Sequence, residues 1–345
     1  MRGDQVTTQT KPEKTFLGAM APPWPITFDD VLQARARLAP YLTPTPLRRY
    51  PLVDELMGRG TSLLIKHENH QPTGSFKVRN GLSFMTGLTA RDRERGVVAA
   101  STGNHGQGIA HAASLLGVRA TICVPVGNNP EKNAAMRGWG AMVVEEGRDY
   151  DESVEVMLRI AREQDMVVAH STNDARVVAG AATLSLEMLE QSGGLDAIAM
   201  AVGGGSQSVG ALTVARELAP RMKVYGAQAA GASAIHDSWH ARSPVRTERA
   251  NTFAEGVATR QPYELTFATL VEGLAGFITV TDAELAEAIR IILKLTHNLV
   301  EGAGAVGLAA ALKFRDELRG MRVGLVFSGG NLDTAVLQRI LSGEV

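Results

Sequence analysis

Short apolar runs alternate with longer amphipathic runs along most of the chain, and this alternation limits the possible folds more than any other feature. The runs with the length and apolar content of buried strands are residues 62–66, 97–100, 120–125, 142–145, 166–169, 197–202, 223–227 and 323–327. Helical patterns lie between most of them or follow them, at residues 106–116, 131–137, 151–164, 181–191, 207–218, 282–299 and 304–317. Strands that alternate with helices predict βαβ units, in which helices cover both faces of a parallel sheet.

The composition suits a globular protein with more than one domain. The chain has 345 residues, of which 45% are hydrophobic and 21% charged, and this length is enough for two hydrophobic cores. Its formal net charge of −1 provides no basic excess for nucleic acid. No apolar run approaches the roughly 20 residues that cross a bilayer. We therefore expect neither nucleic acid nor a membrane as a partner.

Cys123 is the single cysteine and cannot form an internal disulfide, which favours a reducing compartment and hence a cytoplasmic location. It lies in the apolar run 120–125, so we interpret it as a buried strand thiol, because a catalytic thiol needs an electropositive setting. Residues 1–22 mix charges with Thr and Gln and lack the apolar core of a signal peptide. We interpret them as a flexible N-terminal tail.

Residues 71–77 (QPTGSFK) form the first of four glycine-bearing segments that can support chemistry. Pro72 and Gly74 predict a turn, and Ser75 is the expected N-cap of a helix whose first turn contains Lys77. The positive end of the helix dipole disfavours an ammonium group there, so we expect a depressed pKa and a nucleophilic amine at Lys77. Schiff-base chemistry needs such an amine. From this segment alone, a solvated surface lysine is the simpler interpretation.

The other three segments directly follow predicted strands. Residues 101–108 (STGNHGQG) offer free N–H groups at a helix start, which suit a carboxylate. Residues 203–207 (GGGSQ) suit a phosphate, although they match neither G-x-G-x-x-G nor a P-loop. Residues 328–331 (SGGN) place a small hydroxyl after the strand 323–327. Each segment alone is compatible with an ordinary capped turn, but all four fall at strand ends or helix starts that one cleft can bring together.

In order and spacing, these segments resemble the serine/threonine dehydratase and serine racemase family, the fold-type II enzymes that depend on pyridoxal 5'-phosphate (PLP). The resemblance runs from about Ile26 to the end and is carried by residues 73–79 (TGSFKVR), 101–107, 203–205 and 328–331. It implies a tryptophan synthase β-like α/β fold with two three-layer αβα domains, mostly parallel sheets and a homodimer. We expect a large PLP-binding domain of residues 23–95 and 170–345, and a small domain of residues 96–169.

The resemblance implies a role for each matched residue. Lys77 would bind PLP covalently and then act as the base at the substrate Cα, and Ser328 would face the pyridine nitrogen as a neutral partner. Glu301 would lie near the cofactor, unless it only caps a helix. The other cofactor contacts would come from Phe76 at the pyridine ring, Asn104 at its 3-oxygen, and Gly203, Gly204, Gly205 and Ser206 at the phosphate. The substrate carboxylate would be held by Ser101, Thr102, Asn104 and His105.

The chain departs from the family pattern at several positions. The racemases carry a serine that reprotonates Cα at the position of Thr102, so we favour elimination over racemisation. Gln228 and Ala234 stand where relatives have acidic ligands of a divalent cation, so we expect no metal site. The chain ends soon after Asn331 without a regulatory domain, which favours a catabolic or specialised role.

These features predict a PLP-dependent ammonia-lyase (dehydratase) that converts serine, threonine or a bulkier β-hydroxy-L-amino acid to a 2-keto acid and ammonia. A serine racemase-like enzyme and a dehydratase specialised for 3-hydroxyaspartate or phenylserine are the alternatives. β-Replacement fits the segments less well, and the joint presence of Lys77, Asn104 and Ser328 disfavours a protein that only binds small molecules. Residues 228–277 should line the pocket for the substrate side chain. Within that segment, space for a side chain larger than that of serine is expected at Ala229, Ala230, Gly231 and Ala232.

Overall fold

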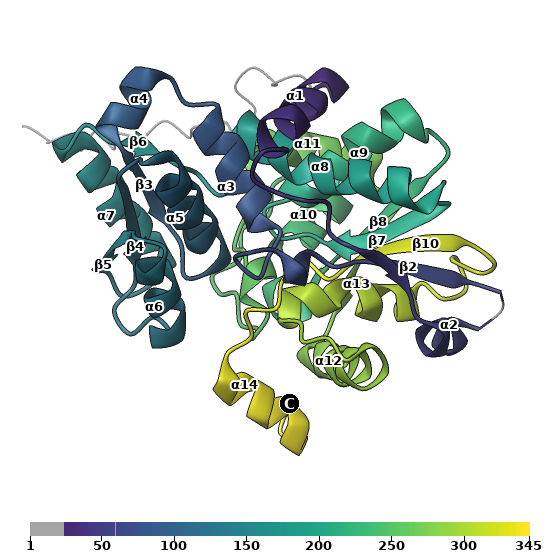
Figure 1. The fold of residues 1–345 in the computed structure, drawn as a ribbon. Helices are drawn as coiled ribbons and strands as arrows, with labels where there is room; N and C mark the ends of the chain where they lie inside the picture. Colours follow the sequence, from purple (N-terminus) through teal and green to yellow (C-terminus); the bar gives the residue numbers. More distant parts are fainter. Residues whose placement is uncertain (1–23, 59) are drawn as a thin grey trace, which may run out of the picture.

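The computed structural model describes residues 24–58 and 60–345, so the predicted tail of residues 1–22 lies outside the described part of the chain. The described strands form two sheets (Figure 1). The larger sheet has the order β1 (Leu47–Arg49), β2 (Ser62–Lys66), β10 (Arg322–Val326), β7 (Ala197–Ala201), β8 (Lys223–Ala229) and β9 (Gly276–Val280). The smaller sheet has the order β5 (Met142–Glu145), β4 (Ala120–Val124), β3 (Val97–Ala100) and β6 (Val167–Val168).

The larger sheet is parallel except at one edge, where β1 pairs with β2 in antiparallel orientation. Successive residues of β7 belong to opposite apolar layers: Ala197 and Ala199 contribute to one, and Ile198 and Met200 to the other. Helices α2 (Pro51–Met57), α12 (Asp282–Thr296) and α13 (Gly302–Lys313) cover the first face. The second face is covered by α1 (Phe28–Leu38), α8 (Ala175–Ser192), α9 (Ser206–Leu218), α10 (Ala234–Ala241) and α11 (Glu264–Gly273).

The strands of the smaller sheet are all parallel and also lie between helical layers. One face packs against α3 (Lys77–Thr86), α5 (Asn104–Leu116) and α6 (Pro130–Gly138), and the other against α7 (Tyr150–Glu163). The remaining elements are α4 (Ala90–Arg95), α14 (Thr334–Ser342), η1 (Glu68–His70), η2 (Ala230–Ala232) and η3 (Glu255–Val257). Each sheet is therefore the middle of three layers, which confirms the predicted αβα architecture with mostly parallel sheets.

Every strand predicted from the apolar runs is present, whereas β1 and β9 were not predicted. As expected, the strands within residues 96–169 form the smaller sheet and the other strands form the larger one. However, α3 precedes residue 96 and still packs tightly on α5. A Cβ atom at Gly108 of α5 would lie only 2.5 Å from the main-chain oxygen of Lys77. The domain boundaries at residues 95/96 and 169/170 therefore stay a prediction. None of the described helices has the length and apolar character needed to cross a membrane.

Candidate active site

A cavity with a volume of ≈ 1060 Å³ is lined by segments that follow strands of both sheets. Residues after β3, after β7 and after β10 all reach it, because the carboxyl ends of these parallel strands converge there. Every site residue expected from the sequence lines it: Phe76, Lys77, Ser101, Thr102, Asn104, His105, Gly203, Gly204, Gly205, Ser206, Glu301 and Ser328. The structure thus brings the four glycine-bearing segments into one place.

Main-chain hydrogen bonds place Lys77 beside the segment that follows β10. The Phe76 N–H donates to the Ser328 carbonyl (2.9 Å), and the Gly330 N–H donates to the Gly74 carbonyl (2.8 Å). Gly74 has φ +67°, a conformation that favours glycine. Lys77 follows this turn as the first residue of α3, and it lines the cavity.

The expected helix cap at Ser75 is wrong. Phe76 occupies the N-cap position of α3, and no side chain caps this helix start. Ser75 instead forms an isolated antiparallel bridge with Gly329, so its main chain belongs to the link with the segment after β10. Its hydroxyl is buried without a hydrogen-bond partner in the described structure. The helix therefore begins two residues later than Ser75.

Lys77 is half-buried in the wall of the cavity, and its amine has no hydrogen-bond partner among the described residues. Burial lowers the pKa of Lys77 to about 8, although the negative charge of Glu301 acts in the opposite direction. Nζ lies 5.0 Å from the centroid of the Phe76 ring. The predicted depression of this pKa is confirmed, and loss of hydration is its largest cause. A neutral amine is therefore accessible at mildly alkaline pH.

The triple-glycine loop presents main-chain donors that have no protein acceptor in the described structure. The N–H groups of Gly203, Gly204, Gly205 and Ser206 make no main-chain hydrogen bond, and they lie at the start of α9. Gly205 has φ +91°, and a Cβ atom at Gly204 would overlap Thr172. Free amides, the dipole of α9 and the close approach of backbone make a nest that fits a phosphate group.

The loop after β3 is held by its own side chains and leaves main-chain groups free. Ser101 Oγ accepts from the N–H groups of Gly106 (2.9 Å) and Gly103 (3.2 Å). His105 Nε2 lies 2.9 Å from the carbonyl oxygen of Ala169, and burial lowers the pKa of His105 to about 3. His105 is therefore neutral, and the side chains of Ser101 and His105 stabilise the loop. No main-chain acceptor in the described structure takes the N–H groups of Thr102, Asn104 or His105.

Glu301 lies beside this loop and does not cap a helix. It occupies the N-cap position of α13, but its side chain makes no capping hydrogen bond. Asn104 Nδ2 donates to Glu301 Oε1 instead (2.6 Å). Burial raises the pKa of Glu301 to about 7, while the charge of Lys132 and the Asn104 hydrogen bond act against that rise. The helix-cap alternative is therefore wrong, and Glu301 belongs to the cavity.

Comparisons with known proteins agree with this geometry. A family model described as pyridoxal-phosphate dependent enzyme matches residues 38–329. The chain belongs to this family of PLP-dependent enzymes. Its cofactor is pyridoxal 5'-phosphate, and it is a lyase of the serine/threonine dehydratase type. The free amides after β7, the buried amine of Lys77 and the 4%-exposed Ser328 form a donor set that fits this cofactor.

Relatives and solved structures cover nearly the whole chain. An L-threonine ammonia-lyase of Thermotoga maritima is 36% identical over 317 residues, covering 92% of this chain and 78% of that protein. An L-threo-3-hydroxyaspartate ammonia-lyase of Saccharomyces cerevisiae is 32% identical over 318 residues, covering 92% and 97%. A crystal structure of T.th. threonine deaminase has a TM-score of 0.84 at 37% identity, covering 89% and 99%. A maize serine racemase structure has a TM-score of 0.87 at 28% identity, covering 93% and 98%.

Part of the segment 228–277, which was expected to line the pocket for the substrate side chain, lines the cavity of this PLP-dependent enzyme. Cavity-lining residues occur at 246, 248–251, 255–261 and 263. Ala229, Ala230, Gly231 and Ala232 do not line the cavity, so the expected space at these positions is wrong. β8 continues through Ala229, and the Asn251 N–H donates to the Gly231 carbonyl (2.7 Å), so the following loop covers this turn.

Gln228 supports the same loop. Its Nε2 donates to Thr259 Oγ1 (2.9 Å), and its Oε1 accepts from the N–H groups of Ile235 (3.1 Å) and His236 (3.0 Å). The amide thus makes hydrogen bonds at a position where relatives were expected to have a metal-binding carboxylate. The absence of a metal site stays a prediction. Cys123, by contrast, is a buried strand residue as predicted, and burial raises the pKa of its thiol to about 11.

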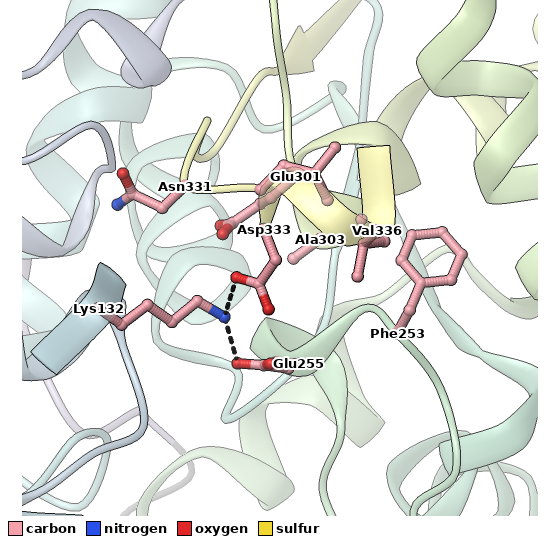
Figure 2. A pocket seen from close by; sticks show the side chains of 10 residues that line it. Lys132, Phe253, Glu255, Glu301, Ala303, Asn331, Asp333 and Val336 are labelled. Carbon is pink, nitrogen blue, oxygen red and sulfur yellow. Dashed lines mark hydrogen bonds and ion pairs between the residues drawn. The ribbon is translucent and has the colours of Figure 1, made fainter. Parts of the chain in front are cut away.

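The sequence did not reveal the ion pairs formed by four charged residues that also line the cavity, Lys132, Asp151, Glu255 and Arg260. Lys132 of α6 pairs with Glu255 (2.8 Å) and Asp333 (3.0 Å), which belong to the layers of the larger sheet (Figure 2). Arg260 pairs with Asp151 of α7. In this pair the cation belongs to a segment of the larger sheet and the carboxylate to a helix of the smaller sheet. These ion pairs join helices of the smaller sheet to segments of the larger one. Their partners lie far apart in sequence, so no local motif announces them.

Proposed function

We propose that the chain is an ammonia-lyase that converts a β-hydroxy-L-amino acid to a 2-keto acid and ammonia. The observation that carries this proposal is the buried amine of Lys77, which shares one cavity with two sets of free main-chain N–H groups. One set suits a phosphate and the other a carboxylate, which are the anionic groups of PLP and of an amino acid. The ammonia-lyases among the relatives support the same reaction class.

In the proposed reaction, most of these cavity residues would bind the cofactor or the substrate, and Lys77 would carry a proton. Gly203, Gly204, Gly205 and Ser206, which line the cavity, would hold the cofactor phosphate. Phe76 would pack on the ring, Asn104 would bind its 3-oxygen, and Ser328 would face its nitrogen. The N–H groups of the loop after β3 bind the substrate carboxylate. Bound PLP supplies an electron sink that acidifies the substrate Cα–H. Lys77 Nζ then accepts that proton, because its lowered pKa makes the neutral amine available.

Ser328 favours elimination over other outcomes. A carboxylate at this position would hold a proton on the pyridine nitrogen, whereas a neutral hydroxyl does so only weakly. With the cofactor bound, Ser328 would therefore favour departure of the β-hydroxyl over a long-lived negative charge at Cα. The water lost with the β-hydroxyl is used again when the released unsaturated amine hydrolyses, so the net products are one ammonia and one 2-keto acid per amino acid.

The test is an assay for 2-keto acid and ammonia with L-serine, L-threonine, threo-3-hydroxyaspartate and phenylserine. We expect equal amounts of both products from at least one of these substrates. Lys77→Ala should abolish turnover, because the base and the covalent attachment point are removed together. Lys294→Ala, on the exposed side of α12, is the matched control and should retain activity. No product from any of the four amino acids would overturn the proposal.

Racemisation is a second candidate activity, because Thr102 places a hydroxyl in the wall of the cavity. Chiral chromatography of serine incubated with the enzyme separates the two activities. A D-serine product that disappears in Thr102→Val but persists in Asn128→Ala, a neighbouring substitution, would assign the second proton carrier to Thr102.

We also propose a homodimer in the cytoplasm, following the family resemblance and the single buried thiol. Light scattering of the purified protein tests the dimer.

A further inference from the structure

Asn331 connects three of the four glycine-bearing segments, although its role was not assigned above. Its Nδ2 donates to the Thr73 carbonyl (2.9 Å) and to Asn104 Oδ1 (2.7 Å). Its side chain also fills the space beside Gly74, where a Cβ atom would lie 2.6 Å from Asn331 Oδ1. The turn before Lys77, the loop after β3 and the segment after β10 therefore meet at this one amide.

The main chain determines which way these amides point. The Thr73 carbonyl can only accept, so the Asn331 amide must turn its nitrogen toward it. The second hydrogen of that nitrogen is donated to Asn104, which must therefore turn its oxygen toward Asn331. The Asn104 nitrogen is then left to face Glu301 (2.6 Å). Asn331 thus donates in two directions, to the Thr73 carbonyl on one side and to Asn104 on the other, and Asn104 in turn donates to Glu301.

The orientation of the Asn104 amide affects the charge of Glu301. A carboxylate accepts a hydrogen bond from Asn104 more readily than a carboxylic acid does, so this donor favours the ionised form of Glu301. Burial acts the other way and raises the pKa of Glu301 to about 7. Because the two effects oppose each other near neutral pH, a change in the orientation of Asn104 would change the charge of Glu301. That charge in turn acts on Lys77.

We propose that Asn331 is a positioning residue that fixes the Asn104 amide so that its nitrogen donates to the carboxyl group of Glu301 beside Lys77. This deepens the proposed function, since Lys77 and Asn104 are assigned there. Asn331 acts through Asn104, which lines the cavity with Glu301 and Lys77. Its effect should therefore appear in the titration of Glu301 rather than in the fold of the protein.

The experiment follows the carboxyl carbon of Glu301 by ¹³C NMR in holoenzyme labelled at the glutamate side chain. The resonance is assigned by its loss in Glu301→Gln. In Asn331→Asp the new carboxylate accepts from Asn104, whose amide then turns its oxygen toward Glu301. We expect the Glu301 titration to move upward by at least about one pH unit, since a hydrogen bond to a charged group is lost. Asn331→Ala should move it in the same direction by less.

Asn69→Asp is the matched control, because Asn69 Nδ2 also donates to a main-chain carbonyl, that of Leu299 (3.2 Å), without contacting Asn104. It adds the same charge near the site and should leave the Glu301 titration close to that of the wild type. An Asn331→Asp shift no larger than that of Asn69→Asp, or an unchanged titration in Asn331→Ala, would overturn the proposal. Circular dichroism verifies that each variant folds. If Asn331→Asp does not fold, the titration of Glu301 in Asn331→Ala decides the outcome.

The NMR readout does not depend on turnover, so it separates this proposal from the proposed reaction. If no substrate yields a 2-keto acid but the titration moves as expected, the positioning role stands and the reaction does not. If turnover is present, the acidic limb of the pH profile of kcat/KM should move upward in Asn331→Asp with the Glu301 resonance. A purely structural role for Asn331 would lower kcat without moving that limb.

Discussion

Glu301 raises the pKa of Lys77 although no hydrogen bond between them is present in the described structure. Loss of hydration disfavours the charged form of each group. The charge of Glu301 partly compensates at Lys77, whereas Lys132 and the Asn104 hydrogen bond do so at Glu301. Burial thus converts an ordinary lysine into a base whose neutral form is available near its working pH. The sequence indicated an amine of this kind from its place at a helix start, and the family resemblance indicated Glu301 near the cofactor, but neither indicated the interaction between the two.

Removing the charge of Glu301 should make the amine of Lys77 more acidic. In Glu301→Gln the interaction that raises the pKa of Lys77 is lost, so this pKa should fall below about 8. Competitive acetylation of the cofactor-free chain, read by peptide mass spectrometry across pH, measures it. The rise in Lys77 reactivity should occur at lower pH than in the wild type. A rise at higher pH, with exposed Lys294 unchanged, would contradict this account.

The thiol of Cys123 should be inert in the folded protein. It lies inside β4, and burial raises its pKa to about 11, so very little thiolate is present at neutral pH. A disulfide reagent should react with less than one thiol per chain in native buffer and with one after denaturation. Rapid modification of the native protein, without loss of its circular dichroism signal, would show that the apolar setting is wrong.

Among the elements, α3 depends on a buried ionic network as well as on apolar packing. Arg79 of α3 donates to Glu68 (2.7 Å) and to Glu187 of α8 (2.7 Å). Lys66 of β2 also pairs with Glu187 (2.7 Å). The charge of Arg79 lowers the pKa of Glu68 despite complete burial. This network ties the helix that begins with Lys77 to β2 and α8.

Arg79→Met should destabilise the fold by about 3–5 kcal/mol, because it leaves two buried carboxylates without their main cation. Denaturant unfolding measures this difference. The control is Arg159→Met, which removes an exposed ion pair with Glu146 and should change stability by less than about 1 kcal/mol. Because the pKa of Glu68 is depressed in the folded state, its contribution is present above its unfolded pKa and is lost as pH falls. Equal effects of the two substitutions would exclude a stabilising role for the buried network.

The pattern of apolar runs predicted the elements that lie in the two sheet interiors, but not those at the edges. β1 has only three residues, and two of them are exposed, so it has no apolar run to detect. β9 starts with Gly276 and has partly exposed residues between Phe277 and Val280. Such edge strands form through pairing with their neighbours, which is a tertiary effect. Ser75 was assigned to the wrong role for a similar reason, since its pairing with Gly329 is not a local property.

At the scale of the whole molecule, charged pairs hold the layers of the two sheets together around the cavity. The Lys132 side chain is only 11% exposed and serves two carboxylates, one of them 123 positions away in the sequence. Arg260 and Asp151 form a second ion pair between the two sides, in which the positions of the cation and the carboxylate are exchanged. The sequence predicted which residues line the cavity, because strand ends carry local motifs. It could not predict these links, because a lone charged residue does not indicate its distant partner.

Breaking the Lys132 link should loosen the association of the two sheets' layers. In Lys132→Ala, Glu255 and Asp333 remain close together without their shared cation, so we expect faster limited proteolysis and a lower kcat/KM. The reversed pair Lys132→Glu with Glu255→Lys should recover part of the loss, and a double-mutant cycle should give a coupling of about 0.5–3 kcal/mol. Lys294→Ala is the control. A cycle without coupling would show that the pair contributes nothing across the layers.

The loop between α10 and α11 forms a wall of the cavity but supplies few of the residues that make the hydrophobic cores. The groups assigned to chemistry lie elsewhere, at the ends of buried strands or at the starts of helices such as α3 and α13. If this wall faces the substrate side chain in the proposed reaction, the selection of an amino acid and the capacity to react with it depend on separate segments of the chain. We expect substitutions within residues 246–263 to change which amino acid reacts while the reactive residues stay the same.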